Sequence, residues 1–174
     1  MSNLSPDPIT VWFTGLPGAG KSTLAVALHE ALRTAGRAAF VLDGDLLRTG
    51  LSQDLGYSAA DRSENIRRIA EVSKLLNCAG LIVISALISP LREDRRRARA
   101  IIGATRFREV YISTPLAVCE RRDPKGHYAR ARRGEIPEFT GVSAPYEPPQ
   151  RPDLAVDTST LGVEDCVRAL LALL

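Results

Sequence analysis

Apolar and polar positions alternate in blocks along the chain, and these blocks predict strands that alternate with helices. Apolar and β-branched runs that favour strands occupy residues 9–14, 38–42, 81–87, 107–112 and 154–156. Apolar residues recur at helical spacing over residues 21–35, 60–79 and 163–174, and two more helices are expected from residue 90 onward and over residues 115–121. This alternation predicts an α/β fold, a doubly wound parallel sheet of five strands with helices on both faces.

Regular periodicity disappears between residues 122 and 152, where glycines and prolines accumulate. A stretch of this length without regular structure inside a compact domain is usually functional, so we expect a long loop or lid over about residues 122–150. The chain has 174 residues, which suffice for one buried core but not for two. Residues 1–174 are therefore expected to form a single domain.

The composition narrows the class of protein without identifying its partner. Hydrophobic residues make up 45% of the chain and charged residues 25%, as in soluble globular proteins. Only three of the 23 basic residues are lysines. Arginine suits phosphate and sulfate, although a GC-rich genome would produce the same bias. The helix that begins near residue 90 is expected to expose Arg92, Arg95, Arg96 and Arg99. Acidic residues stand among these arginines, so we favour a solvated face over a nucleic-acid partner.

The cysteines and the N-terminal segment bear on the cellular compartment. Cys78, Cys119 and Cys166 are widely separated and match neither zinc ligands nor a disulfide framework, so we expect free buried thiols. Residues 1–8 lack the charged and apolar regions of a signal peptide. No apolar run approaches the ~20 residues that span a bilayer. We expect a cytoplasmic protein with no membrane partner.

The turn after the first predicted strand carries the clearest chemistry. It fits the Walker A pattern in full. The matching residues are Gly15, Leu16, Pro17, Gly18, Ala19, Gly20, Lys21 and Ser22, and Thr23 follows directly. The glycines allow backbone N–H groups to surround a phosphate, and the following helix directs its positive end at the same anion. Lys21 can bridge the β- and γ-phosphates, and Ser22 can ligate Mg²⁺. The sequence therefore predicts a P-loop NTPase fold that uses ATP with Mg²⁺.

Two further features favour a small-molecule kinase among P-loop proteins. No Asn-Lys-x-Asp motif for guanine is present, and the predicted lid would exclude water from the site. Asp43 and Asp45 end the second predicted strand, at the sheet edge that faces a ligand crevice. Either carboxylate could orient an acceptor hydroxyl, take its proton or hold Mg²⁺ through water, or could instead cap the next short helix.

A cluster of basic and amide side chains follows these carboxylates. Arg48 lies within one helical turn, and a spacing of three puts Arg62 and Asn65 on one helix face. These three residues make a plausible oxyanion pocket. Arg67 and Arg68 are better explained as a solvated helix face.

From Val11 to about Pro149 the chain resembles one family, the adenylyl-sulfate kinases. The matching strings occupy residues 15–23, 42–45, 54–58, 61–62, 64–68, 80–83, 88–90, 119–126, 131–136, 139–141 and 145–147. This resemblance implies transfer of a phosphoryl group from ATP to the 3′-hydroxyl of adenylyl sulfate, which gives 3′-phosphoadenylyl sulfate and ADP in sulfate assimilation. It also implies a homodimer.

The resemblance assigns roles to individual residues. It implies that Arg48, Arg62 and Asn65 hold the phosphosulfate and that the rings of Tyr57 and Phe139 enclose the adenine. Ile88 and Ser89 would form part of the substrate wall, and Lys125 would reach the transferring phosphoryl group. Arg121 and Arg122 would flank the ATP adenine or close on its phosphates. In the family the serine at the position of Ser89 is described as a phosphoserine intermediate. Direct in-line transfer needs no such step, and Ser89 could equally cap the following helix.

A few positions depart from the family pattern and keep an alternative open. Leu46, Thr49 and Leu87 stand where the family commonly has Asn, His and Phe, and Pro17 replaces a common Ser. The alternative is a kinase of the same fold that acts on another nucleotide-like or sugar-like alcohol. A catalytically silent subunit is disfavoured, because the P-loop lysine and serine, both aspartates and the lid lysine are all intact.

Overall fold

Five parallel strands form one sheet at the centre of the computed structural model, which describes residues 8–174. The strands are β1 (Thr10–Thr14), β2 (Ala39–Asp43), β3 (Ile82–Ala86), β4 (Phe107–Ile112) and β5 (Leu154–Val156). They lie in the order β2-β3-β1-β4-β5, and every neighbouring pair is parallel. The predicted doubly wound sheet is thus confirmed, with strand bounds within two residues of those expected.

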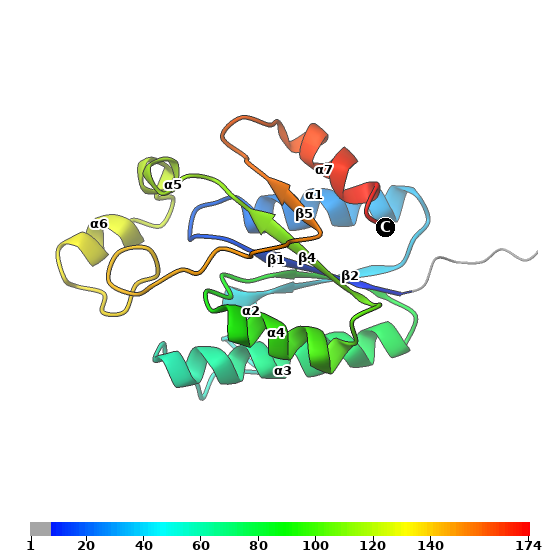
Figure 1. Cartoon of the computed structure of the whole chain (residues 1–174), viewed down its shortest axis with the longest axis horizontal. Coiled ribbons are helices and arrows are strands. Elements are labelled where there is room, and N and C mark those ends of the chain that lie inside the picture. The colour runs from blue at the N-terminus through cyan, green and yellow to red at the C-terminus, as the bar shows by residue number, and fades with distance from the viewer. Residues whose placement is uncertain (1–7) are drawn as a thin grey trace, which may run out of the picture.

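Helices cover both faces of the sheet (Figure 1). One face carries α1 (Lys21–Thr34) and α7 (Val163–Leu171), and the other carries α3 (Ala59–Cys78) and α4 (Arg92–Ile102). The shorter helices are α2 (Gly44–Leu47), α5 (Leu116–Arg122) and α6 (His127–Arg132). In Figure 1, α5 and α6 lie together beyond one end of the sheet.

Side-chain alternation along β1 divides the core between the two faces. Phe13 packs with the α1 side chains Leu24 and Leu28, whereas Trp12 packs with Ile69 of α3 and with Phe107. Successive residues of a strand point to opposite faces, so one short strand supplies both cores. The segments that leave β1, β2 and β3 at their carboxyl ends are consequently fixed from both sides.

The Arg-rich helix α4 contradicts one expectation. Arg96 is exposed as predicted, but Arg95 is only 2% exposed and forms an ion pair with Glu109 on β4. Helical spacing alone placed Arg95 on the outer face. Burial of the guanidinium is possible because Glu109 and two backbone carbonyls accept its hydrogen bonds.

The segment over residues 122–150 is also less irregular than expected, because it contains α6. Only Tyr128 and Ala131 of this helix are buried, which leaves no apolar periodicity to detect. The Asp123 carboxylate holds the start of the helix by accepting from the backbone N–H groups of Tyr128 and Ala129.

The structure bears on the expected state of the cysteines and on the expected lack of a membrane segment. Cys119 and Cys166 are buried free thiols as predicted, but Cys78 is exposed at the end of α3. Over residues 8–174, no helix has the length and apolarity that crossing a membrane requires. The predicted absence of a signal peptide concerns residues 1–8, of which the first seven lie outside the described part of the chain.

Candidate active site

A cleft of about 880 Å³ opens where β1, β2 and β3 end, within the size range of small-molecule sites. Three parts of the chain meet there: the P-loop, the ends of β2 and β3 with the start of α3, and the lid. Its walls include Pro17, Gly18, Gly20, Lys21, Ser22, Thr23, Asp43, Asp45, Arg48, Tyr57, Arg62, Asn65, Ile88, Ser89, Arg122, Lys125, Phe139, Thr158 and Leu161.

The P-loop turns tightly between β1 and α1. A Cβ atom at Gly15 would lie 2.6 Å from the carbonyl oxygen of Ile112, so only glycine fits where the loop leaves the sheet. Gly15, Leu16 and Ala19 are not among the residues that line the cleft. The loop thus presents the amino end of α1 to the cleft.

Lys21 is buried against this loop. Its ammonium group donates to the carbonyl oxygens of Gly15, at 2.9 Å, and Leu16, at 2.6 Å. Burial lowers the pKa of Lys21 to about 8, although the nearby Asp45 and Asp43 carboxylates act in the opposite direction. The cation is therefore held in place at the base of the cleft by two backbone acceptors.

The two aspartates that the sequence left equivalent have different partners. The Ser22 hydroxyl donates to Asp43 Oδ2 at 2.7 Å, and Asp43 Oδ1 accepts from the backbone N–H of Asp45 at 2.9 Å. Asp43 thus caps α2 and also contacts the P-loop. Asp45 caps nothing and instead pairs with Lys125 of the lid, which raises the pKa of that lysine.

These oxygens fit a magnesium ion bound together with a nucleotide. Among residues 8–174 there is no cluster of three or more His, Cys, Asp or Glu side chains that could hold a metal by itself. Magnesium in kinase sites typically takes one or two protein oxygens and completes its shell with phosphate and water. The Ser22 hydroxyl and Asp43 carboxylate supply such a pair.

Two guanidinium groups enter the cleft without acidic partners. Arg48 donates to the Gly56 carbonyl at 2.7 Å, and Arg62 donates to the Tyr57 carbonyl at 2.7 Å and to the Thr140 hydroxyl at 2.6 Å. In the described part of the chain, neither forms an ion pair. Burial, and then the charge of Arg48, lower the pKa of Arg62. Two positive charges in one wall create a strong preference for an anion.

The next polar side chains of α3 differ in whether they reach the cleft. Asn65 is 6% exposed, and its side-chain oxygen has no hydrogen-bond partner. Arg67 pairs with Glu64, and Arg68 pairs with Glu64 and Asp54, so both remain outside the cleft wall.

Two aromatic rings line the same half of the cleft. Tyr57 is 64% exposed, and the Arg48 guanidinium covers one face of its ring at 4.4 Å from the centroid. Phe139, from the lid, is 9% exposed and packs edge-on against Tyr128, with their centroids 5.0 Å apart. One ring is fixed by the lid and the other remains accessible for stacking.

Ser89 does not cap α4. The helix begins at Arg92, and its N-cap residue is Leu91, whose side chain makes no capping hydrogen bond. Ser89 is 2% exposed with a φ of 42°, and its hydroxyl accepts a hydrogen bond from Trp12 Nε1 at 3.0 Å. The capping alternative is therefore wrong.

The structure separates the two arginines that the resemblance placed at the nucleotide, and it adds a further loop to the cleft wall. Arg121 is exposed and outside the cleft wall, whereas Arg122 lies in it and donates to the hydroxyl and carbonyl of Thr158, both at 2.8 Å. Thr158 in turn donates to the Ala19 carbonyl at 2.9 Å. The loop after β5, with Thr158 and Leu161, carried no motif. Its position at a carboxyl strand end is the signal that could have indicated it.

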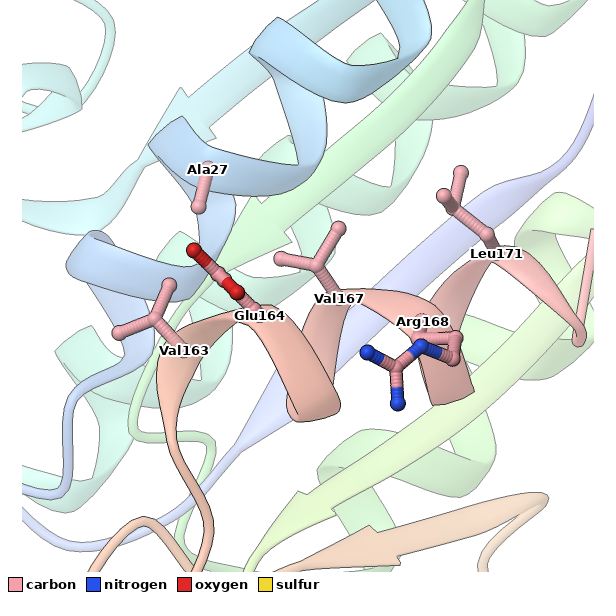
Figure 2. Close-up of a pocket in the computed structure, with 6 residues that line it drawn as sticks. All are labelled: Ala27, Val163, Glu164, Val167, Arg168 and Leu171. Carbon is pink, nitrogen blue, oxygen red and sulfur yellow. The ribbon is translucent and has the colours of Figure 1, made fainter.

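A second, shallower hollow lies between α1 and α7 (Figure 2). Val163, Val167 and Leu171 of α7 form most of its apolar surface, opposite Ala27 of α1. It has no set of polar groups that converge on one point. The cleft at the P-loop is therefore the candidate active site.

Comparisons with known proteins agree with this geometry. The family model described as "Adenylylsulphate kinase" matches residues 7–157. An adenylyl-sulfate kinase of Shewanella denitrificans is 56% identical over 170 residues, which are 98% of this chain and 83% of that protein. The solved Mycobacterium tuberculosis APS kinase CysC, in complex with AMPPNP and APS, is 47% identical. It superimposes with a TM-score of 0.93 over 97% of this chain and 98% of the other.

A more distant structure extends the comparison to a larger protein. The hexameric APS kinase from Thiobacillus denitrificans is 37% identical and superimposes with a TM-score of 0.72, over 96% of this chain and 28% of that one. Sequence, fold and cleft thus agree, and the chain belongs to the adenylyl-sulfate kinase family.

Proposed function

We propose that this kinase transfers the γ-phosphoryl group of ATP to the 3′-hydroxyl of adenylyl sulfate, producing 3′-phosphoadenylyl sulfate and ADP. The observation that carries the proposal is the pair of guanidiniums, Arg48 and Arg62, that face the cleft without carboxylate partners beside an accessible ring. A phosphosulfate offers the two negative charges that would pair with these guanidiniums, and an adenine offers a flat face for the rings of Tyr57 and Phe139.

The reacting groups follow from the contacts at the opposite wall. Lys21 and the P-loop N–H groups hold the ATP phosphates, and Ser22 with Asp43 would hold Mg²⁺, which supplies charge neutralisation on the phosphates. Asp45 accepts the proton of the 3′-hydroxyl as its oxygen forms a bond to the γ-phosphorus and the bond to the β-phosphate oxygen breaks. Lys125, which pairs with Asp45, would leave it and contact the transferring phosphoryl group instead. The Asp45 carboxylate is then free to take the proton.

The remaining assignments are also part of this proposal. Ser89 lines the acceptor wall without becoming phosphorylated, because its buried hydroxyl already accepts from Trp12 and in-line transfer needs no enzyme nucleophile. The chain acts in the cytoplasm as a single domain and as a homodimer, with small-molecule substrates. A nucleic-acid partner is disfavoured because Arg96 and Arg99 of α4 are engaged by acidic side chains.

A direct product assay tests the proposed reaction. Purified protein is given Mg·ATP with adenylyl sulfate, or with adenosine 5′-monophosphate as the acceptor without sulfate, and nucleotides are separated and quantified. Rapid formation of 3′-phosphoadenylyl sulfate that requires the sulfate is the expected result. Turnover with another alcohol but not with adenylyl sulfate would overturn the proposal and direct attention to Leu46, Thr49 and Leu87.

Nucleotide binding is expected to weaken as pH rises above about 8, the pKa to which burial lowers Lys21. Phosphates bind the protonated lysine. Affinity is therefore constant below this pKa and falls above it, by up to about tenfold for each pH unit. Calorimetric titration with Mg²⁺ and a non-hydrolysable ATP analogue from pH 7 to 9.5 measures the effect. The Lys21→Met variant should show weak binding without this slope, and a flat wild-type curve would contradict the assignment.

A further inference from the structure

Arg95 is more deeply buried than most charged side chains, yet it is not part of the cleft wall. Its guanidinium donates to three acceptors that come from three separate segments. Nε reaches Glu109 Oε1 on β4 at 2.7 Å, Nη1 reaches the Ser89 carbonyl at 2.6 Å, and Nη2 reaches the Glu147 carbonyl at 2.7 Å. One rigid side chain thus joins the acceptor wall to the segment through which the lid returns to the sheet.

The acceptor wall needs this support because Ser89 adopts an uncommon backbone conformation. Its φ of 42° lies in the left-handed region, which a non-glycine residue occupies only where its surroundings enforce it. Donors surround the residue: Trp12 Nε1 reaches its hydroxyl, while the Thr14 hydroxyl reaches its carbonyl at 3.2 Å. Arg95 supplies the one charged donor to that carbonyl.

The end of the lid is fastened to the same turn. The backbone N–H of Glu147 donates to the Pro90 carbonyl at 2.9 Å, and the Glu147 carboxylate accepts from the backbone N–H of Arg92 at 2.8 Å. The hydroxyl of Tyr146 lies 3.0 Å from that of Thr14, the residue directly before the P-loop. The lid's end therefore contacts both the turn that contains Ser89 and the residue that precedes the P-loop.

We propose that Arg95 is a positioning residue that couples the C-terminal end of the lid, at Glu147, to the acceptor wall, at Ser89. The inference rests on the proposed kinase function. The planar guanidinium fork can satisfy three acceptors in different directions, which a lysine ammonium on a flexible stem cannot do with the same geometry. Loss of the fork should loosen the acceptor wall and the lid together, so the acceptor binds less well and water reaches the γ-phosphate.

The test compares Arg95→Lys with Arg96→Lys, its neighbour on α4, whose exposed side chain pairs only with Glu93. Initial rates are measured with Mg·ATP and adenylyl sulfate, and ADP and phosphorylated product are quantified separately. In Arg95→Lys, we expect KM for the acceptor to rise about tenfold, KM for ATP to stay within about twofold, and ADP to exceed the phosphorylated product. Arg96→Lys should match the wild type.

A merely structural role would give a different signature. A lower unfolding temperature with unchanged KM values and one ADP per product would overturn the proposal. If Arg95→Lys fails to fold, Tyr146→Phe removes the hydroxyl contact with Thr14 while the ring can keep its stacking on Tyr111. Tyr146→Phe should show a smaller rise in KM for the acceptor and a smaller excess of ADP over product. If neither change occurs, the coupling is contradicted.

Limited proteolysis separates failure of this inference from failure of the proposed function. The exposed lid residues Arg130, Arg132 and Arg133 are trypsin sites whatever the acceptor is. We expect cleavage there to be several-fold faster in Arg95→Lys than in the wild type or in Arg96→Lys. Equal cleavage rates would overturn the coupling. If the wild type makes no product but the cleavage rates still differ in this way, only the proposed acceptor is overturned.

Discussion

Replacing Lys21 by methionine is expected to lower kcat for phosphoryl transfer by about a thousandfold, the upper end of the range for removal of one preorganised charge-stabilising group. The ammonium lies at the base of the cleft and is held by the carbonyls of Gly15 and Leu16, so it is in position before nucleotide binds. Methionine keeps the length of the side chain but provides neither charge nor donor. Steady-state rates with saturating Mg·ATP and adenylyl sulfate measure the loss.

The same variant should remain at least as stable as the wild type. Burial moves the pKa of Lys21 from 10.5 to about 8, so holding the charged form in the fold costs about 3 kcal/mol at neutral pH. Thermal unfolding provides the comparison, with the exposed Lys74→Met as the matched control for both activity and stability. Lys21→Met activity near that of Lys74→Met would remove Lys21 from the mechanism. Loss of activity through unfolding would leave its role unsupported.

The P-loop could be predicted from the sequence because its chemistry is contiguous. Eight consecutive residues supply the turn, the backbone donors and the side chains, and the strand and helix that flank them carry their own periodicities. The relevant contacts also run between near neighbours, such as that from Lys21 to Leu16. Local sequence was sufficient for this part of the site.

Arg95 shows where local sequence is insufficient. Helical spacing describes only which face of α4 a residue occupies, whereas the three acceptors of Arg95 belong to Ser89, Glu109 and Glu147. Thr158 was missed for the same reason, because its partner in the P-loop is the carbonyl of Ala19. Such contacts depend on how the chain returns to the sheet, which no single stretch of sequence records.

The two aspartates required the structure for a related reason. As a sequence, Asp43-Gly44-Asp45 offers two carboxylates at one strand end with equal claims to the acceptor proton. In the fold, the Asp43 carboxylate accepts from the Ser22 hydroxyl and from the start of α2, whereas the Asp45 carboxylate pairs with the lid lysine Lys125. Partners on other segments therefore distinguish the two carboxylates, and for this reason we propose that Asp43 serves the magnesium side and Asp45 the acceptor side.

Asp45→Asn is therefore expected to lower kcat by about a hundredfold to ten-thousandfold, the range for loss of a general base. The amide retains the size of the carboxylate but cannot take the 3′-hydroxyl proton. Since Asp45 is exposed and caps no helix, thermal stability should stay close to that of the wild type. Single-turnover rates at saturating substrates isolate the chemical step from binding.

Asp43→Asn supplies the comparison that distinguishes the two carboxylates. Its activity should recover in part as Mg²⁺ is raised from about 1 to 50 mM, because a weakened metal site can be filled by mass action. Activity of Asp45→Asn should not recover, and Asp165→Asn, on the surface of α7, should behave as the wild type. Rescue of Asp45→Asn by Mg²⁺, with no rescue of Asp43→Asn, would exchange the two roles and make Asp43 the residue that takes the proton.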